Sequence, residues 1–328
     1  MVKPPVNMPT ETHPRCLVLG GKGFIGSHLV DALLHKGFPV KVFDRANIPP
    51  LNDAAAAAQV EWIDGDFTSD ADVGRALAGC DVCYHLVSTT LPQSSNADPV
   101  FDVETNVAGT IRLLNHAVRL GVKKVVFISS GGTVYGIPRQ VPISEDHPTN
   151  PICSYGITKL AIEKYLHLYL TLHGLDYTVL RLSNPFGERQ RIQASQGAVA
   201  VFMGKALRGE RIDIWGDGSV VRDYVYVGDA VAALVKAATY RGDERVLNIG
   251  SGAGISLNQI LDGIEQVTGC KAERTYTAAR AFDVPVSVLA TARARDALGW
   301  TPTTSFADGL KRMMLWMQTE ARDTSRKS

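Results

Sequence analysis

A tyrosine and a lysine stand four positions apart near the middle of the chain, at Tyr155 and Lys159. On an α-helix these two positions share a face, so the ammonium group can lie close to the phenol. A neighbouring positive charge favours the phenolate and should lower the pKa of the tyrosine from its usual value of about 10. Such a tyrosine can exchange a proton with an alcohol near neutral pH. Both residues are also common on helix surfaces, so whether the pair is catalytic depends on the strands and helices around it.

A glycine-rich segment near the N-terminus predicts a phosphate site. An apolar run at 16–20 leads through Gly20, Gly23 and Gly26 into an amphipathic stretch at 24–36. The three glycines permit a tight turn, the approach of a pyrophosphate to the backbone, and close contact between helix and strand. The N-terminus of the helix then offers free N–H groups to an anion. This order of strand, turn and helix is typical of a dinucleotide site.

An acidic residue follows the next predicted strand. Asp44 lies at about the distance from the glycines where a ribose-binding carboxylate is expected. It would accept hydrogen bonds from the adenosine ribose and repel a 2′-phosphate, which favours NAD over NADP. Arg45 beside it is the residue that could favour a 2′-phosphate instead. An aspartate at a strand end can also serve only as a turn former.

Short apolar segments alternate with amphipathic ones through the first half of the chain, which predicts a parallel sheet covered by helices on both faces. We expect an α/β fold: a Rossmann-type doubly wound parallel sheet with a smaller C-terminal α/β domain that binds the substrate. Strands are predicted at 16–20, 39–43, 60–63, 82–86, 123–129 and 176–182, and helices near 24–36, 98–120 and 154–172. The expected division is a flexible tail at 1–14, a dinucleotide-binding domain at 15–184 joined by 223–240, and a mainly substrate-binding domain at 185–328.

Composition excludes several classes of function. The formal net charge of the 328 residues is +1, so no nucleic-acid or membrane-surface partner is predicted. No apolar run approaches the roughly 20 residues that span a bilayer. Five scattered cysteines suit a reducing cytoplasm. Cys80 and Cys83 form a single C-x-x-C without a second ligand pair, so we predict a packing role and no metal.

Taken together and in this order, these motifs resemble the extended short-chain dehydrogenase/reductases, and among them the nucleotide-sugar epimerases of the UDP-glucose/galactose 4-epimerase type. The resemblance runs from about Arg15 to Trp300, and its residues include Gly23-Phe24-Ile25-Gly26. It implies NAD as the cofactor and a role in nucleotide-sugar metabolism, commonly in carbohydrate biosynthesis. The cofactor-binding residues that it implies are Gly20, Gly23, Phe24, Ile25, Gly26, Asp44, Arg45, Asp66, Phe67, Leu86, Val87, Ser88, Asn106, Ser129, Tyr155 and Lys159.

The same resemblance implies that the C-terminal part binds a UDP-sugar. Trp215 would lie beside the uracil, while Arg222 and a second arginine would contact the diphosphate. Ser287 stands where many UDP-galactose epimerases carry a bulky aromatic residue, which leaves volume for an N-acetyl or carboxylate group. Each residue alone could equally be surface charge or core. The complete set of predicted substrate-binding residues is Asn184, Val199, Trp215, Arg222, Arg280, Asp283 and Ser287.

One position departs from the family pattern. Gly131 falls where the family carries a catalytic serine or threonine, so Ser130 or Thr133 would have to supply that hydroxyl, or Tyr155 would act alone. The neighbouring Gly132 and Thr133 also replace the acids that related dehydratases need, which argues against dehydration.

The expected activity is epimerisation of a UDP-sugar at C4 through a transient 4-ketone, with Tyr155 as acid and base and Lys159 beside it. Two alternatives remain: a nucleotide-ketosugar reductase or dehydrogenase of the same family, and a catalytically weakened nucleotide-sugar-binding protein. Wide apolar stripes at 98–120 and 154–172 can pack on the sheet, but family precedent favours a homodimer through these helices.

Overall fold

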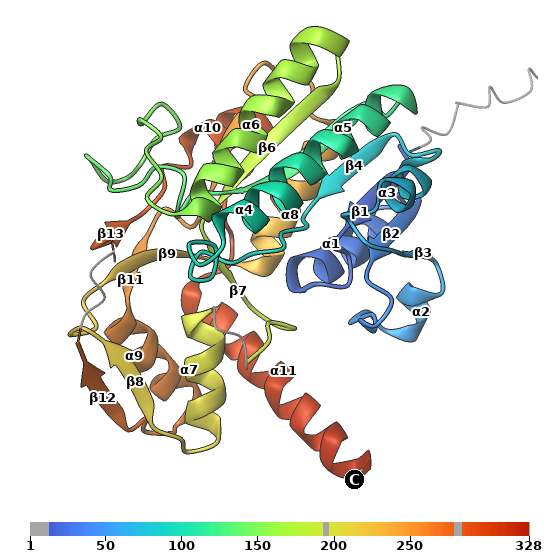
Figure 1. Cartoon of the computed structure of the whole chain (residues 1–328). Helices are drawn as coiled ribbons and strands as arrows, with labels where there is room; N and C mark the ends of the chain where they lie inside the picture. The colour runs from blue at the N-terminus through green and yellow to red at the C-terminus, as the bar shows by residue number, and fades with distance from the viewer. Residues whose placement is uncertain (1–12, 193–196, 279–283, 328) are drawn as a thin grey trace, which may run out of the picture.

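A seven-stranded parallel sheet forms the centre of the molecule (Figure 1). This computed structural model describes residues 13–192, 197–278 and 284–327. The strands lie in the order β10-β6-β5-β4-β1-β2-β3. Their bounds are Cys16–Leu19 (β1), Val40–Asp44 (β2), Glu61–Asp64 (β3), Val82–His85 (β4), Lys124–Ser130 (β5), Asp176–Leu182 (β6) and Val246–Ile249 (β10). All six predicted strands are confirmed, with ends that differ by a residue or two, while β10 was not predicted.

Helices cover both faces of this sheet, as the alternation of segments predicted. On one face, Val18 of β1 packs in a core with Leu29 of helix α1 (Phe24–His35) and Leu234 of helix α8 (Val227–Thr239). On the other face, Leu17 and Leu19 pack with helices α3 (Asp70–Leu77), α5 (Gly109–Arg119) and α6 (Ser154–His173). Successive β1 side chains therefore enter two separate cores, which is why this strand is apolar throughout.

The helix predicted at 98–120 is interrupted. It consists of a short α4 (Pro99–Asp102), a π-helical stretch η1 (Val103–Ala108) and then α5. Asn106 lies within η1, and its side-chain amide donates to the backbone carbonyl of Asp102 at 3.1 Å. Local π-helical turns of this kind often occur at functional sites.

The C-terminal part adds two small sheets and four helices beside the carboxyl ends of the large sheet. Strand β9 pairs in parallel with β7 and β13 and antiparallel with β11, and β8 pairs in parallel with β12. Helix α8 follows β9 along the chain but packs on α1 over the large sheet. The elements are β7 (Asn184–Phe186), α7 (Ala198–Leu207), β8 (Ile212–Trp215), β9 (Val221–Tyr226), β11 (Gly254–Ser256), α9 (Leu257–Thr268), β12 (Arg274–Thr277), β13 (Val286–Ser287), α10 (Ala292–Leu298) and α11 (Phe306–Lys327), with a short α2 (Ala54–Ala57) in the first half.

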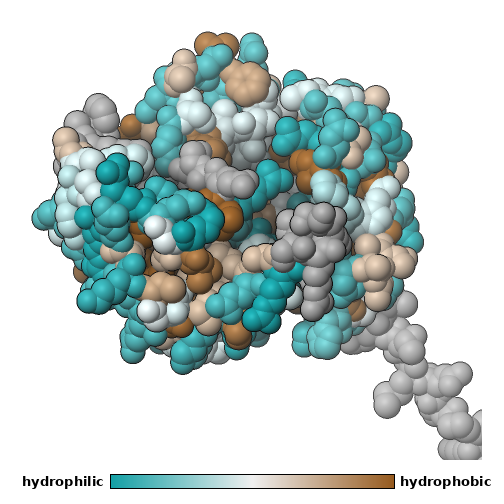
Figure 2. Space-filling model, turned by 90° about the horizontal axis from the view of Figure 1, so that it is seen from below, coloured by the Kyte–Doolittle hydropathy of each residue, from teal (hydrophilic) through white to brown (hydrophobic). Residues whose placement is uncertain are grey.

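Within the described ranges, no helix is both long and apolar enough to cross a bilayer. The face seen from below is mostly hydrophilic, with hydrophobic residues in separate groups (Figure 2).

Candidate functional site

The glycine turn after β1 is shaped to let a ligand approach the backbone. Gly20 has a φ of +84°, which favours glycine. A Cβ at Gly26 would lie 2.2 Å from the Gly20 carbonyl oxygen, so the first turn of α1 can contact the turn only without a side chain there. Gly23 caps α1 and supplies no side-chain hydrogen bond to its N–H groups. These N–H donors at the N-terminus of α1 fit a phosphate group, as the glycine spacing predicted.

The predicted ribose-binding carboxylate is held in place by backbone donors. The two oxygens of Asp44 accept hydrogen bonds from the N–H groups of Lys22 and Arg45, at 2.9 and 2.8 Å. The Lys22 side chain is buried and donates to Asp64 at 2.8 Å and to the Arg45 carbonyl at 3.2 Å. Lys22 therefore ties the glycine turn to the ends of β2 and β3. Arg45 itself is exposed.

The residues predicted along the rest of the dinucleotide lie at the same edge. A Cβ at Gly20 would lie 3.5 Å from atoms of both Leu86 and Val87, so the end of β4 touches the glycine turn. Asp66 is exposed, and two hydrogen bonds from Thr68 hold the pKa of its carboxyl below the ordinary value. Two of the other predicted side chains turn elsewhere: the Phe67 ring packs on buried His85, and the Ser88 hydroxyl donates to the Thr90 carbonyl.

Tyr155 and Lys159 lie together on the first turns of α6, as predicted. The Lys159 Nζ atom is 5.5 Å from the centre of the Tyr155 ring and donates to the Ile128 carbonyl at 3.0 Å. Burial lowers the pKa of Lys159 to about 8. Burial also raises the pKa of Tyr155 well above its usual value, with smaller contributions from Cys153 and Asp102. This direction is opposite to the lowering predicted from Lys159, because burial disfavours the charged phenolate.

Asn106 of η1 faces the segment that follows β4. Its side-chain oxygen accepts a hydrogen bond from the Thr89 N–H at 3.0 Å, and its amide donates to the Thr89 hydroxyl at 2.8 Å and to a carboxylate oxygen of Asp102 at 2.8 Å. Asp102 is fully buried. Asn106 thus positions the backbone that continues from the dinucleotide edge toward Tyr155.

Local crowding explains why no hydroxyl occupies position 131. A Cβ at Gly131 would lie 2.5 Å from Cδ1 of Leu289 and 3.1 Å from the Arg181 carbonyl oxygen. The two hydroxyls that flank it differ in access: Ser130 is partly exposed, whereas the Thr133 Oγ1 atom is buried and has no hydrogen-bond partner among the described residues. Of the two hydroxyls, that of Thr133 is therefore shielded from solvent.

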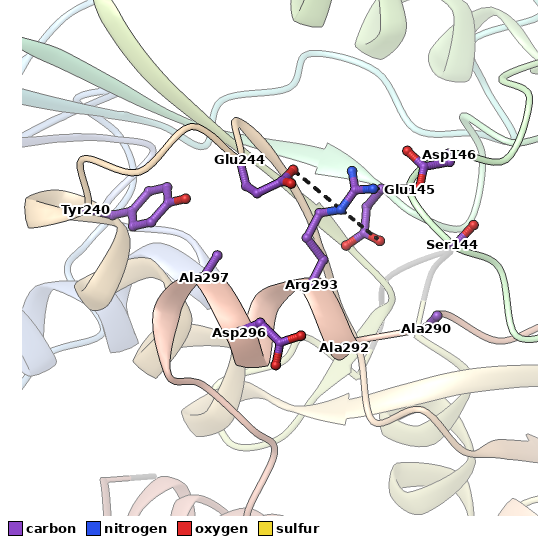
Figure 3. Close-up of a pocket in the computed structure, with 10 residues that line it drawn as sticks. All are labelled: Ser144, Glu145, Asp146, Tyr240, Glu244, Ala290, Ala292, Arg293, Asp296 and Ala297. Carbon is purple, nitrogen blue, oxygen red and sulfur yellow. Dashed lines mark hydrogen bonds and ion pairs between the residues drawn. The ribbon is translucent and has the colours of Figure 1, made fainter.

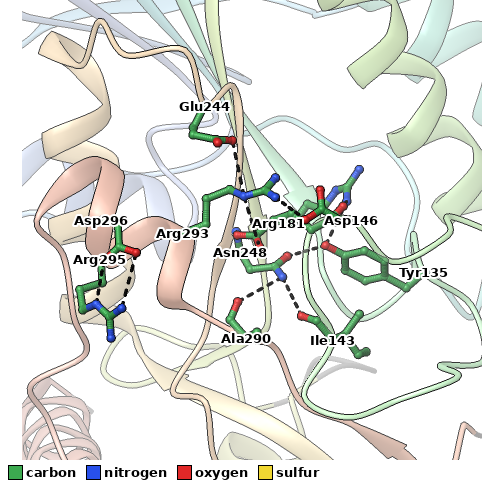
Figure 4. Close-up of polar contacts among 11 residues, drawn as sticks. Tyr135, Ile143, Asp146, Arg181, Glu244, Asn248, Ala290, Arg293, Arg295 and Asp296 are labelled. Atoms are coloured by element: carbon green, nitrogen blue, oxygen red, sulfur yellow. Dashed lines mark hydrogen bonds and ion pairs between the residues drawn. The ribbon is translucent and has the colours of Figure 1, made fainter.

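An ion pair beneath this loop fixes its position. Arg181 of β6 forms a two-point contact with Glu163 of α6, at 3.1 and 2.6 Å, and donates to the Tyr135 hydroxyl at 3.0 Å. Tyr135 in turn donates to Asn248 of β10 at 2.6 Å (Figure 4). The Ser129 hydroxyl donates to Glu163 at 2.5 Å, so any contact of Ser129 with a dinucleotide would come from its backbone.

A pocket of about 510 Å³ opens on the far side of this network, between α10 and the 144–146 loop (Figure 3). Arg293 crosses it, with nitrogen-to-oxygen distances of 2.6 Å to Asp146, 3.4 Å to Glu244 and 3.9 Å to Glu145. The pocket's charged groups therefore largely pair with one another. None of the predicted site residues lines it.

Three predicted substrate-binding residues meet on the strands around β9. Arg222 of β9 lies opposite Ser287 of β13, and Asn184 of β7 lies opposite Tyr224. The Asn184 amide donates to the Asp223 carbonyl at 2.9 Å, and Arg222 donates to the Val284 carbonyl at 2.5 Å. Adjacent strands lie about 4.8 Å apart, so Arg222 and Ser287 are neighbours.

The remaining predicted substrate-binding residues are spread more widely. Trp215 ends β8 and is 47% exposed, which suits a stacking surface. Val199 is buried in the first turn of α7, where backbone N–H groups have no acceptor within the helix. Arg280 and Asp283 lie outside the described residues.

Comparison with known proteins places this site in a family. Residues 16–250 match the NAD dependent epimerase/dehydratase family. The chain belongs to this family. A putative UDP-glucose 4-epimerase of Methanocaldococcus jannaschii is 36% identical over 307 residues, which are 93% of this chain and 99% of that protein.

Solved structures agree with this membership. UDP-glucose 4-epimerase of Thermotoga maritima with UDP-glucose has a TM-score of 0.88 at 36% identity, covering 94% of this chain and 99% of that one. UDP-glucose 4-epimerase of Thermus thermophilus in complex with NAD has a TM-score of 0.84 at 32% identity, covering 93% and 99%. These findings confirm the predicted family, the Rossmann-type fold class and NAD as the cofactor.

Sequence reasoning missed several buried charges in this family member's site. Glu163 falls four positions after Lys159, so the same helical spacing that linked Tyr155 to Lys159 could have indicated another inward-facing group. Lys22, inside the glycine turn, and Asp102, between exposed apolar residues, carry no comparable signal in the sequence. Their roles appear only when strands and helices from distant segments meet.

Proposed function

We propose that this epimerase/dehydratase family member is an NAD-dependent 4-epimerase of a UDP-sugar. The observation that carries the proposal is the placement of Tyr155 and Lys159 at the edge of the sheet where the glycine turn, Asp44 and the end of β4 converge. The likeness to the UDP-glucose 4-epimerases of Thermotoga maritima and Thermus thermophilus supports the substrate class.

In the proposed mechanism, the Tyr155 phenolate accepts the proton of the sugar 4-hydroxyl and later returns it to the oxygen of the 4-ketone, after the ketosugar has turned its opposite face toward the cofactor. Bound NAD would supply the reversible hydride acceptor for C4 and, in its oxidised form, a positive charge in the site. That charge opposes the burial that raises the pKa of Tyr155. Lys159, whose ammonium donates to Ile128, holds the cofactor's ribose and adds positive charge.

We further propose that Ser130 supplies the hydroxyl that Gly131 lacks. Ser130 follows Ser129 at the end of β5, so their side chains point to opposite faces. The Ser129 hydroxyl is engaged by Glu163 and the Thr133 hydroxyl is buried, which leaves Ser130 as the accessible group. Its hydroxyl would donate to the 4-oxygen of the sugar while Tyr155 moves the proton.

The substrate half supports a nucleoside diphosphate ligand. Arg222 would pair with the diphosphate, Asn184 and the Val199 N–H would donate to it, and Trp215 would stack near the base. Ser287, opposite Arg222, leaves space at the sugar for a group larger than a hydroxyl. Arg280 and Asp283 remain predicted contacts to the phosphate and the ribose.

We also infer a homodimer in the cytoplasm. Val100 and Phe101 on α4, Val103 on η1, and Ile157 and Leu172 on α6 are exposed, and these helices pack side by side. A second copy placed against this face would bury them in a bundle of helices. The described cysteines are free thiols, which suits a reducing compartment.

The deciding experiment is proton NMR of the purified protein with UDP-glucose, UDP-N-acetylglucosamine and UDP-glucuronate in turn, without added cofactor. We expect a C4 epimer of at least one sugar, with no net change in absorbance of reduced nicotinamide. Net reduction of added NAD, with a ketosugar formed in equal amount, would indicate a dehydrogenase or a ketosugar reductase running in reverse. No conversion of any sugar, with or without NAD, would indicate a binding protein.

A further inference from the structure

A buried carboxylate lies directly behind the candidate catalytic tyrosine. Asp102 ends α4 and is 0% exposed. One of its oxygens accepts hydrogen bonds from the Thr90 hydroxyl at 2.5 Å and the Asn106 amide at 2.8 Å. The other accepts from the Ser154 hydroxyl at 2.7 Å and, more weakly at 3.4 Å, from the Thr158 hydroxyl, which also donates to the Tyr155 carbonyl at 2.9 Å. The four donors come from three segments: the loop after β4, η1, and the first turns of α6.

The start of α6 depends on such contacts because it lacks a cap of its own. Cys153 stands at the N-cap position and makes no side-chain hydrogen bond to the helix. Instead, the Ser154 N–H donates to the Asn96 side chain at 2.8 Å, and the Tyr155 N–H donates to the Ser95 hydroxyl at 3.0 Å. An uncapped helix end with free N–H groups is normally prone to fray. Here the turn that carries Tyr155 is held by residues far from it in the sequence.

We propose that Asp102 is the positioning residue of this active site: its carboxylate locks the first turn of α6, which carries Tyr155, to η1, which carries Asn106. A carboxylate suits this role because it accepts several short hydrogen bonds at once, and a buried one is strongly held by them. Asp102 thereby fixes Tyr155 on α6 relative to Asn106 and to the segment after β4 that Asn106 contacts. This inference rests on the proposed function, since it assigns Asp102 a purpose in that reaction.

Because Asp102 is charged, its removal should change the pH dependence of the reaction, which the loss of a packing contact alone would not do. Among the described residues, the titratable groups that face it are Cys153, Tyr155 and Lys159, all at the start of α6. The group that the loop after β4 places on Asp102 is the uncharged Thr90 hydroxyl, while Asp98 in that loop and Glu104 on η1 are exposed. Burial is the largest cause that raises the pKa of Tyr155, followed by Cys153 and then by Asp102. Removal of its charge should therefore let Tyr155 act as a base at lower pH.

The test compares Asp102→Asn with Asp102→Ala and Ser154→Ala in the NAD-loaded protein. An asparagine can still accept from Thr90 and Asn106 and can donate to the Ser154 hydroxyl, so the fold should survive. We expect Asp102→Asn to lower kcat roughly 10-fold and to move the acid limb of the kcat–pH profile to lower pH. Asp102→Ala should lower kcat roughly 100-fold, because small displacements of a catalytic group are costly. KM should change less than about twofold in each case.

Ser154→Ala keeps the charge and loses one hydrogen bond, so kcat should fall while the pH profile stays in place. The matched control is Asp229→Asn, since Asp229 is also buried and accepts from the Thr303 hydroxyl at 2.8 Å and the Thr304 N–H at 2.9 Å, away from α6. That variant should lose stability without a shift of the pH profile.

Amide hydrogen exchange over 153–158 tests the lock without any need for activity. Exchange there should be at least 10-fold faster in Asp102→Ala than in the unchanged protein, and unaffected in Asp229→Asn. An Asp102→Ala variant with unchanged exchange and unchanged kcat would overturn the proposal, as would an Asp102→Asn profile that coincides with that of the unchanged protein. If the unchanged protein epimerises no UDP-sugar, the proposed function fails, whereas the exchange result still decides whether Asp102 holds the helix.

Discussion

The cofactor half and the substrate half of this molecule are assembled in different ways. In the cofactor half, the glycine turn, Asp44 and the end of β4 come together because parallel strands place their carboxyl ends at one edge. In the substrate half, Asn184 and Ser287 flank β9 although 103 positions separate them in the sequence. The first arrangement follows from short, ordered motifs, and the second depends on pairing between very short strands. Tyr155, on α6 of the cofactor half, is the proposed proton carrier, so the reaction should depend on it even when both ligands are bound.

Substitution of Tyr155 should therefore have the largest effect. Tyr155→Phe removes the hydroxyl that moves the proton and should lower kcat about 1,000-fold, in the range of general acid–base catalysis. Because the ring remains, binding of NAD and of UDP should change little. Stopped-time NMR assays of epimerisation, with calorimetry of both ligands, would measure this. An active Tyr155→Phe enzyme would remove Tyr155 from the mechanism.

A substitution in the glycine turn should weaken the binding of NAD without affecting the binding of the UDP-sugar. In Gly26→Ala, the added methyl would lie 2.2 Å from the Gly20 carbonyl oxygen, so the turn and the start of α1 must separate. We expect NAD affinity to fall about 100-fold and stability to fall by about 2 kcal/mol. Calorimetry with NAD and thermal unfolding would show both.

Gly132→Ala is the matched stability control, because a Cβ there meets nothing within 4 Å. If Gly26→Ala bound NAD as well as the unchanged protein, the dinucleotide would not contact this turn.

The two halves also differ in what the sequence could reveal. The strand and helix periods of the first half predicted β1 to β6 and α1 closely, and the order of glycine turn, Asp44 and Tyr155 predicted where they meet. The predicted helix at 98–120 changes to π-helical geometry at η1, where the Asn106 side chain donates to the Asp102 carbonyl, and apolar spacing does not encode that contact. The pKa of Tyr155 was also misjudged, since spacing gives proximity of charges but not the burial that outweighs them.

Substitution of Arg222 should weaken the binding of the UDP-sugar without affecting the binding of NAD. Arg222→Met removes the charge proposed to meet the diphosphate and should raise the KM for the UDP-sugar about 20-fold with little change in NAD affinity. Since Arg222 also donates to the carbonyls of Val221 and Val284, Arg222→Lys serves as the control that keeps the charge. The KM of Arg222→Lys should lie between that of the unchanged protein and that of Arg222→Met. Equal KM values for Arg222→Met and the unchanged protein would place the diphosphate elsewhere.

The smallest expected effect concerns Lys159 of the cofactor half. The proposed reaction needs its positive charge, but the burial of that charge lowers the stability of the fold. Burial lowers the pKa of Lys159 to about 8 from an ordinary 10.5, so the folded state releases the proton more readily than the unfolded state. The unfolded state thus binds more protons between about pH 8 and 10.5, and stability should rise with pH across that window. Lys159→Met removes the buried charge and its hydrogen bond to Ile128. We therefore expect the free energy of unfolding to be about 1 kcal/mol higher in this variant at pH 7, and the difference to vanish near pH 10.5. Urea unfolding at several pH values would measure it, and a variant less stable than the unchanged protein at pH 7 would show that the lysine stabilises the helix it serves.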